Sequence, residues 1–370
     1  MNNRKTPRIR FKGFTDDWEQ RKLGDVLRTL PFKQFLKTPE QGGKYEIIQQ
    51  GNEPIIGYAN GEPCESFRNT VIFGDHTLSL YKPKKPFFVA TDGVRILQGT
   101  NDMDGYYLLS LLEGNSLKSE GYKRYYSILL DREVLLTENH CEQVQIGLCF
   151  KHFDHLITLH QRKLEKLKIV KKAMLENCFP KNGEKVPKFR FFGFTGDWEQ
   201  RKFSDLVETR RGLTYKPADI REIGVRVLRS SNIDEDCFVR RSDDIFVDVN
   251  AINIDFAKEN DILITAANGS SRLVGKHTIL SDIPDKSTVH GGFMLLGTSE
   301  EAYFANALMS STWYKKFIDL YVSGGNGAIG NLNKRDLDEQ DIFIPTKKEQ
   351  QVIGHYFASF DHLITLHQRK

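Results

Sequence analysis

Two phrases of this chain occur twice, and they constrain its fold more than any single motif does. Residues 7–26, PRIRFKGFTDDWEQRKLGDV, share thirteen of twenty positions with residues 187–206, PKFRFFGFTGDWEQRKFSDL. The segment FDHLITLHQRK is identical at all eleven positions in residues 153–163 and 360–370. The long stretches between the copies barely resemble each other. This pattern predicts a repeated frame that carries two unlike inserts, arranged as a pseudo-twofold internal repeat.

The bulk properties indicate a globular protein with two domains. The 370 residues are enough for two domains, each with its own core. The composition, with 39% hydrophobic and 28% charged residues, is ordinary for such a protein. The sequence contains no apolar run of the roughly 18 residues that span a membrane, and its first residues lack an apolar signal core. The five cysteines form no CxxC pair, which favours reduced thiols in a cytoplasmic protein.

The clearest predicted helix runs from Phe153 to about Asn177. Its apolar residues recur at three- and four-residue steps and form one stripe: Phe153, Ile157, Leu164, Leu167 and Met174. At 1.5 Å per residue, this helix would span roughly 38 Å. The stripe is too narrow for burial on all sides, so we expect a partner helix. The obvious partner is the second copy, which begins at Phe360 and includes Ile364.

The two copies of this helix differ in length in the sequence. After HQRK the first copy continues as LEKLKIVKKAMLENCFP, whereas the second copy stops at Lys370, which indicates either a shortened chain or a naturally short arm. We therefore expect Leu164, Leu167 and Met174 to be exposed unless another chain covers them. This predicts concentration-dependent self-association or dependence on a partner subunit. A strict monomer in light scattering over a wide concentration range would count against self-association.

Both inserts are predicted to be α+β, because short strand-like runs are separated by Gly, Asn and Asp clusters. In the first insert we expect a helix at 105–112 and strands at 45–50, 70–73, 87–90 and 127–130. In the second we expect a helix at 302–320 and strands at 225–228, 261–265, 278–280, 293–296 and 342–345. The predicted domains are a first globular domain (1–152), a central spacer helix (153–180), a second globular domain (181–359) and a truncated helix (360–370).

Catalytic signatures are missing from the sequence. The segment GSSRLVGK at 269–276 has five residues between its glycines instead of the four of a phosphate-binding loop. HExxH, GxSxG and the adenine-methylation tetrapeptides NPPY and DPPY do not occur. His155 and His160 repeat with their helix, which favours packing or capping over metal binding. We therefore predict no catalytic residue, no cofactor and no metal site.

Polar, loop-like patches are the remaining candidates for function. Gln and Asn side chains can read adenine, Arg can read guanine, and Ser can contact either base. The candidates in the first insert are Gln50, Asn52, His76 and Thr77. Those in the second insert are Arg229, Ser230, Asn232, Asn268, Ser270, Ser271 and Arg272, with a further patch at 323–327. Ordinary surface loops have the same composition, so both interpretations stay open.

A basic segment lies at the centre of the chain. Residues 151–190 contain eleven Lys and Arg against four Asp and Glu. This charge suits either a solvated helix face or a surface for phosphate or an acidic partner.

The repeated phrases, P-x-x-R-F-x-G-F-T-x-D-W-E-Q-R-K and F-D-H-L-I-T-L-H-Q-R-K, resemble the specificity subunit of type I restriction-modification systems. Three other segments are similar to this family: IPTKKEQQVIGHYF (344–357), VLRSSNID (227–234) and ENDILITAANG (259–269). The resemblance covers essentially the whole chain. It implies two target recognition domains, each reading one half of a split sequence in double-stranded DNA. The conserved helices would pair as an antiparallel coiled coil that separates them.

The resemblance also implies partners. Methyltransferase subunits would dock on the constant regions, and a restriction and translocation subunit would join that complex. The chain itself would be non-catalytic and would direct adenine methylation or DNA cleavage by its partners. Two alternatives remain: a stand-alone DNA-modifying enzyme, and a repeat-built protein adaptor without DNA contact.

Overall fold

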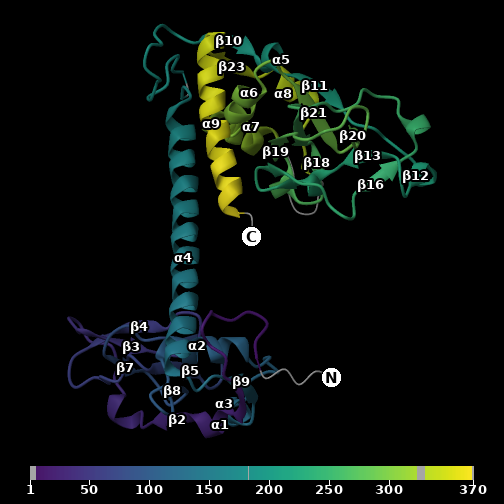
Figure 1. Cartoon of the computed structure of the whole chain (residues 1–370). Helices are drawn as coiled ribbons and strands as arrows, with labels where there is room; N and C mark the ends of the chain where they lie inside the picture. The colour runs from purple at the N-terminus through teal and green to yellow at the C-terminus, as the bar shows by residue number, and fades with distance from the viewer. Residues whose placement is uncertain (1–5, 182, 323–329, 369–370) are drawn as a thin grey trace. The chain divides into compact units, whose positions relative to one another are not determined.

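The structure is a computed structural model that describes residues 6–181, 183–322 and 330–368 (Figure 1). The chain divides into two compact units, unit 1 (Met1–Leu159) and unit 2 (His160–Lys370). The long helix α4 (His140–Asn177) contributes its first part to unit 1 and the remainder to unit 2. Each unit has its own hydrophobic core, so each has the basic requirement of an independent domain.

Unit 1 contains two sheets and a separate strand pair. Its elements before α4 are β1 (Glu19–Lys22), α1 (Leu23–Val26), β2 (Leu27–Leu30), η1 (Lys33–Phe35), β3 (Tyr45–Ile48), β4 (Ile55–Ala59), β5 (Thr70–Gly74), β6 (Leu80–Tyr81), β7 (Phe87–Val89), β8 (Val94–Gly99), α2 (Gly105–Gly114), α3 (Tyr126–Leu130) and β9 (Glu133–Leu136). The first sheet has the order β2-β8-β5-β6, the second has the order β4-β3-β7, and β1 pairs with β9. Every residue of β5, TVIFG, is buried, as expected of a strand covered on both faces.

Unit 2 begins within α4 and ends with the helix α9. Its other elements are β10 (Glu199–Lys202), α5 (Phe203–Leu206), β11 (Glu208–Arg211), η2 (Pro217–Asp219), β12 (Ile220–Arg221), β13 (Val225–Leu228), η3 (Ser230–Asn232), β14 (Ile233–Asp234), β15 (Cys237–Phe238), β16 (Ile245–Val247), η4 (Val249–Ala251), β17 (Ile262–Thr265), β18 (Ala267–Asn268), η5 (Ser271–Leu273), β19 (His277–Ile279), β20 (Thr288–His290), β21 (Met294–Thr298), α6 (Ala302–Met309), α7 (Thr312–Tyr321), β22 (Gly330–Asn331), α8 (Lys334–Asp338), β23 (Asp341–Ile344) and α9 (Lys347–Gln368). The two larger sheets have the orders β11-β21-β17-β19 and β12-β16-β13-β20.

The two inserts share one topology although their sequences barely resemble each other. The antiparallel order β2-β8-β5-β6 of unit 1 corresponds strand for strand to β11-β21-β17-β19 of unit 2. In the other sheet, β3 pairs antiparallel with β4 and parallel with β7, just as β13 pairs with β16 and β20. The repeat therefore extends from the constant frame into the variable inserts, where only the fold is preserved.

The constant frame is built by the same contacts in each unit. Strand β1 pairs antiparallel with β9 in unit 1, and β10 pairs with β23 in unit 2. The guanidinium of Arg10 donates two hydrogen bonds to the buried carboxylate of Glu142, and Arg190 does the same to Glu349. Each doubled phrase is thus fixed to the first turns of the helix that follows its insert.

A glycine allows that helix to approach the insert closely. A Cβ at Gly147 would lie 2.7 Å from the backbone nitrogen of Tyr107 at the start of α2. A Cβ at Gly354 would lie 2.8 Å from the backbone nitrogen of Phe304 in α6. Because the two glycines are equivalent by the offset of 207, α2 and α6 occupy the same place in the frame.

The predicted α+β class is confirmed, but two predicted elements are wrong. Residues 127–130 belong to the helix α3, because the backbone N–H groups of Tyr125 and Tyr126 bond to the carbonyl and the carboxylate of Asp75 and so start a helical turn. The helix expected over 302–320 is interrupted at Ser310 and Ser311, where the backbone of Ser311 is extended. Short apolar runs fit either structure, so only tertiary contacts decide between them.

The long helices begin ahead of the repeated FDHLITLHQRK segments and run antiparallel. Helix α4 starts at His140, where Asn139 accepts a hydrogen bond from the backbone N–H of Glu142. In unit 2, α9 lies along the part of α4 that belongs to this unit (Figure 1). His160 contacts His367, and Lys171 contacts Asp361, so the two chain directions are opposite.

The antiparallel direction overturns one expectation about exposure. Leu164, Leu167 and Met174 are partly buried, because α9 lies against the C-terminal part of α4. The exposed apolar residues of α4 lie mainly further towards its N-terminus: Leu148, Phe150, Phe153, Leu156, Ile157 and Leu159, together with Ile169 and Val170. Within the described residues, no helix combines the length and the apolar character that a bilayer crossing requires.

Candidate nucleic-acid interface

The structure brings the predicted polar patches together at one corner of each unit. In unit 1, Gln50 follows β3 and His76 follows β5. In unit 2, Ser230 follows β13, and Asn268 lies just beyond β17. Since β3 corresponds to β13 and β5 to β17, the two pairs occupy the same place in the shared topology. We name these places corner 1 (Gln50, Asn52, His76 and Thr77) and corner 2 (Arg229, Ser230, Asn268 and Ser270).

Hydrogen bonds join the two strand ends of corner 1. The side-chain oxygen of Gln50 accepts a bond of 3.1 Å from the backbone N–H of His76. The His76 ring also stacks on Tyr122, with 4.7 Å between ring centroids and 6° between planes. Asn52 and Thr77 are exposed beside them. The corner therefore presents amide, hydroxyl and imidazole groups next to an aromatic face.

A buried carboxylate holds corner 1 in place. Asp75 lies between Gly74 and His76 and is almost fully buried. It accepts hydrogen bonds from the guanidinium of Arg95 at 2.9 Å and from the backbone N–H of Tyr126 at 2.8 Å. Because its partners come from β8 and α3, the loop that carries His76 is fixed to the core of unit 1.

Corner 2 is joined in a similar way. The Asn268 side-chain amide donates a hydrogen bond of 2.9 Å to the hydroxyl of Ser230. The side-chain oxygen of Asn268 accepts a bond from the backbone N–H of Ser270. The Arg229 guanidinium donates to the carbonyl of Asp243 and lies 3.7 Å from its carboxylate. These contacts orient polar side chains from two strand ends towards one place.

A recess of about 870 Å³ opens beside corner 2. Its polar lining includes Arg229, Ser230 and Asn268, and its apolar lining includes Tyr215 and Phe293. Phe293 exposes 71% of its surface although it adjoins a core strand. A planar group that entered the recess could stack on an aromatic ring and bond to the polar side chains at its edge.

A buried histidine next to the recess is uncharged at neutral pH. His290 precedes the lining residues Gly291 and Gly292 and is almost fully buried. Burial lowers the pKa of His290 to about 4, which outweighs the effect of its hydrogen bond to the carbonyl of Arg210. The charge at this corner therefore comes from arginine side chains at the surface.

The structure corrects the prediction that the Asn232 side chain contacts DNA bases. Its side chain is completely buried. The amide accepts a bond from the backbone N–H of Arg229 and donates to the carbonyl of Val239 and the carboxylate of Asp244. With these bonds made inside the core, Asn232 shapes the loop and has no polar atom left for a base edge.

The other predicted residues lie outside the joined corners. Ser271 and Arg272 are exposed in the η5 turn. The patch at 323–327 lies outside the described residues. Tyr122, Tyr215 and Phe293 were missed, because a single aromatic residue in a loop gives no periodic signal in the sequence.

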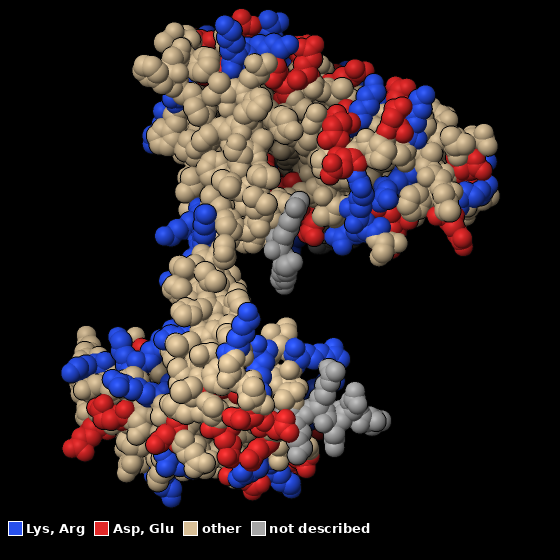
Figure 2. Space-filling view, viewed as in Figure 1, with Lys and Arg blue, Asp and Glu red and all other residues tan. Residues whose placement is uncertain are grey.

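Lysine and arginine side chains are grouped near parts of both units (Figure 2). In this view they gather beside β3 and β4 of unit 1 and below β16 and β18 of unit 2. Acidic side chains are mixed among them, in agreement with the formal net charge of only +4. Such a surface offers limited attraction for phosphate and depends more on specific contacts.

The predicted helix-pairing residues differ in their surroundings. Ile364 of α9 is buried, Met174 packs against the core of unit 2, and Phe360 packs edge-on against Tyr356. Leu164 and Leu167 are partly buried. By contrast, Phe153 and Ile157 expose more than half of their surfaces.

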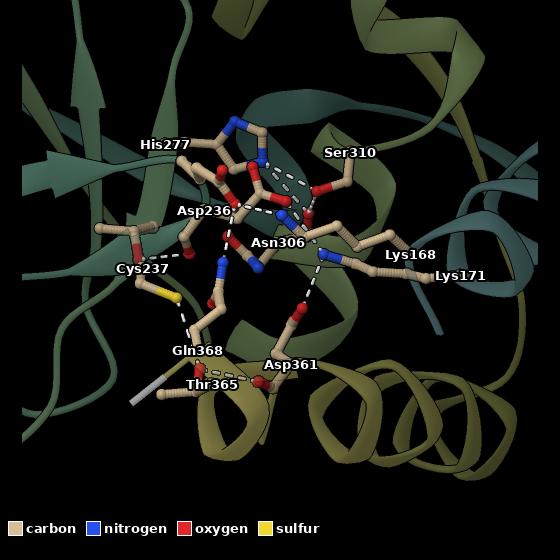
Figure 3. Close-up of polar contacts among 12 residues, drawn as sticks. Lys168, Lys171, Asp236, Cys237, His277, Asn306, Ser310, Asp361, Thr365 and Gln368 are labelled. Carbon is tan, nitrogen blue, oxygen red and sulfur yellow. Dashed lines mark hydrogen bonds and ion pairs between the residues drawn. The ribbon is translucent and has the colours of Figure 1, made fainter. Parts of the chain in front are cut away.

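A polar junction joins the helix pair to the second insert (Figure 3). The Lys171 ammonium lies 2.6 Å from the Asp361 carboxylate and 3.1 Å from that of Asp236. Burial alone would lower the pKa of Lys171, but the two carboxylates outweigh it and raise the pKa. Lys168 and Gln368 both contact Glu235 beside this junction. Among the described residues, no group of His, Cys, Asp and Glu side chains suits a metal ion.

Known proteins match this chain in sequence and in fold. Residues 195–370 match the family described as "Type I restriction modification DNA specificity domain". The chain is 22% identical to the type I restriction enzyme MjaVIII specificity subunit of Methanocaldococcus jannaschii, over 96% of this chain and 88% of that protein. Its fold is similar to the crystal structure of the S subunit of a type I restriction-modification system from M. genitalium. That similarity has a TM-score of 0.61 at 15% identity and covers 98% of this chain and 94% of the other.

Proposed function

This chain belongs to the DNA sequence-specificity subunits of type I restriction-modification systems, and we propose that its two inserts each read one half of a split target. Specificity subunits are the non-catalytic DNA-recognition part of such systems. The observation that carries the proposal is the hydrogen-bonded corner that recurs in two inserts of unlike sequence. A preserved fold with different polar side chains is what two readers of different half-sites require.

The side chains of each corner suit the reading of base edges. In corner 1, Gln50 and Asn52 offer amides that can bond to adenine, and His76 and Thr77 add further polar groups. In corner 2, Arg229 suits guanine, Asn268 suits adenine, and Ser230 suits either. Tyr122 and Phe293 add aromatic faces beside these groups. We propose that corner 1 and corner 2 contact different halves of the target in double-stranded DNA.

We further propose that partner subunits perform the chemistry. Methylation of adenine within a duplex requires the base to leave the stack, which suits a separate enzyme that this reader positions. Methyltransferase subunits would bind the constant frame, and a restriction and translocation subunit would join the assembly. The doubled Arg10–Glu142 and Arg190–Glu349 contacts support two equivalent docking places, since they shape the same surface twice.

The experiment exchanges one insert and maps methylated adenines across a genome. Cells express this chain with its methyltransferase subunits, and residues 26–152 are replaced by the equivalent segment of another specificity subunit. We expect one half of the methylated motif to change and the other half to remain. A change in both halves would show that the inserts do not read independently. Methylation by the purified chain alone with S-adenosylmethionine would favour a stand-alone enzyme.

A further inference from the structure

The turn that leads into β21 places one aromatic ring at the recess beside corner 2. Phe293 is the last residue before β21, and its carbonyl accepts hydrogen bonds of 2.9 and 3.0 Å from the backbone N–H groups of Ala266 and Ala267. Its side chain lines the recess and is largely exposed. The backbone of Phe293 is therefore fixed to the core sheet, while its ring is free to contact a ligand.

Gly93 holds the corresponding place in unit 1. It is the last residue before β8, the strand that corresponds to β21. Its carbonyl accepts a bond of 2.8 Å from the backbone N–H of Asp75, which follows β5 just as Ala266 follows β17. Strand order and hydrogen bonding therefore agree that Gly93 and Phe293 are equivalent.

Corner 1 is closed at this place. A Cβ added at Gly93 would lie 2.5 Å from the side-chain nitrogen of Gln50, so the Gln50 amide occupies the space that a side chain there would need. In unit 2 the residue two positions beyond the corresponding strand is Ser230, which has a much shorter side chain. The shared fold therefore presents a filled corner in unit 1 and a recess in unit 2.

Two glycines leave part of the recess wall without side chains. Gly291 and Gly292 both line the recess. A Cβ added at Gly292 would lie 3.3 Å from the hydroxyl oxygen of Thr214, which also lines it. A larger residue at this position would narrow the opening between them, so the local sequence keeps the recess accessible.

The recess shares its polar edge with corner 2. Arg229, Ser230 and Asn268 belong to both. The Nε atom of Arg229 has no hydrogen-bond partner among the described residues, and the Asn268 amide has a second N–H besides the one that bonds to Ser230. A planar ring in the recess could therefore lie on Phe293 and bond at its edge to these donors. A nucleobase has such a ring, with acceptors along its edge.

A base inside an intact duplex cannot use the recess in this way. Its two faces are covered by the neighbouring bases, and only its groove edges are accessible. A base that has left the stack presents both a face and an edge, and enzymes that act on bases bind such bases in pockets lined by aromatic side chains. Edge reading alone needs no recess, as the filled corner of unit 1 illustrates.

We propose that unit 2 binds one unstacked nucleobase of its half-site in this recess, with the base on the Phe293 ring and its edge towards Arg229 and Asn268. Unit 1, whose corner Gln50 fills, reads only bases that remain stacked. The inference rests on the proposed function, because the half-site that unit 2 reads supplies the base. This base is distinct from the adenine that a partner enzyme methylates.

The test measures how tightly the chain, assembled with its methyltransferase subunits, binds duplexes that carry the mapped target. Each base pair of both half-sites is converted in turn to a mispair, except the pairs that contain a methylated adenine. A mispaired base costs less to remove from the stack. One position in the half-site of unit 2 should therefore bind about tenfold more tightly when mispaired, and no position in the half-site of unit 1 should do so.

Variants of Phe293 show whether the recess produces this gain. Phe293→Ala should reduce the gain to less than about twofold, because the unstacked base then loses its aromatic contact. Phe293→Trp should preserve it, since tryptophan also offers a ring face. Ile223→Ala, at an exposed apolar residue of unit 2 outside the recess, is the control and should keep the full gain.

Four results would overturn the inference: no gain at any position of the half-site of unit 2, equal gains in both half-sites, a full gain in Phe293→Ala, or binding of free adenosine or guanosine that the target duplex does not displace. The last result would identify a site for a free nucleoside. A methylation map without a split target would contradict the proposed function, whereas a split target without a mispair gain contradicts this inference alone.

Discussion

Arg10 and Glu142 form a two-pronged contact, with the guanidinium Nε and Nη2 atoms 2.6 and 2.8 Å from the carboxylate oxygens. The carboxylate is completely buried and also accepts a bond from the Thr137 hydroxyl. The same arrangement joins Arg190 to Glu349 in unit 2. The frame of each unit therefore depends on one arginine that neutralises a buried carboxylate.

We expect Arg10→Met to destabilise unit 1 strongly, because it leaves the Glu142 carboxylate buried without its cation. The unfolding temperature of unit 1 should fall by several degrees in thermal denaturation. Arg21→Met is the control in the same unit, since Arg21 pairs with Glu19 in an exposed position where such pairs contribute little. Equal losses in the two variants would contradict a special role for the buried contact.

Gly147→Ala should destabilise unit 1 by about 1–3 kcal/mol, because the added Cβ overlaps the backbone at the start of α2. Gly354→Ala should have the same effect on unit 2. In Gly114→Ala the new Cβ meets no atom within 4 Å, so the variant should be neutral or up to about 1 kcal/mol more stable. Urea unfolding of the three variants measures the contrast, and a tolerated alanine at Gly147 would refute the close approach.

Asn232→Ala should lower the stability of unit 2 by about 2 kcal/mol, because it removes the donor to the Oδ1 atom of the buried Asp244 carboxylate and to the Val239 carbonyl. Ser270→Ala, at an exposed residue of corner 2, should leave the stability unchanged. Chemical denaturation followed by tryptophan emission suits this test, since Trp198 and Trp313 both lie in unit 2. An Asn232→Ala protein with normal stability and altered DNA specificity would restore Asn232 as a reading residue.

Asn268→Ala should relax base discrimination in one half of the methylated motif, and Gln50→Ala should relax it in the other half. Each lost side-chain contact to a base corresponds to about 1–3 kcal/mol of discrimination. Sequencing of methylated adenines provides the measurement. Glu62→Ala and Glu222→Ala, at exposed positions outside the corners, are the controls for unit 1 and unit 2. Relaxation of both halves by one variant would contradict separate readers.

Unit 2 should lose stability as the pH falls from about 6.5 to about 4. Burial lowers the pKa of His290 to about 4, whereas an unfolded histidine titrates near 6.5. Protons therefore bind the unfolded state preferentially in this range, and the loss contributed by His290 reaches up to about 3 kcal/mol at pH 4. His290→Gln should flatten this part of the stability profile. An unchanged profile in the variant would assign the pH dependence to other groups.

The sequence determined the repeated frame. Residues 7–26 and 187–206 share thirteen positions, and residues 153–163 and 360–370 share all eleven, which indicates an internal repeat. It also determined the strands β3, β5, β13 and β17, whose apolar runs are long enough to identify a strand. The residues around Ser127 and Ser310 could not be assigned from the sequence. Their local preferences are balanced, and a hydrogen bond to a distant residue, such as that from the Tyr126 backbone N–H to Asp75, decides the outcome.

For the candidate site, the sequence supplied the polar residue types and tertiary structure decided which of them act together. Pairing of strands far apart in the chain brings Gln50 to His76 and Ser230 to Asn268. The same packing withdraws Asn232 into the core, although its sequence context resembles that of its exposed neighbours. Ile157 and Ile364 lie in identical segments, yet Ile157 is exposed and Ile364 is buried. A side chain's burial depends on what packs against it, and an identical local sequence carries no record of that neighbour.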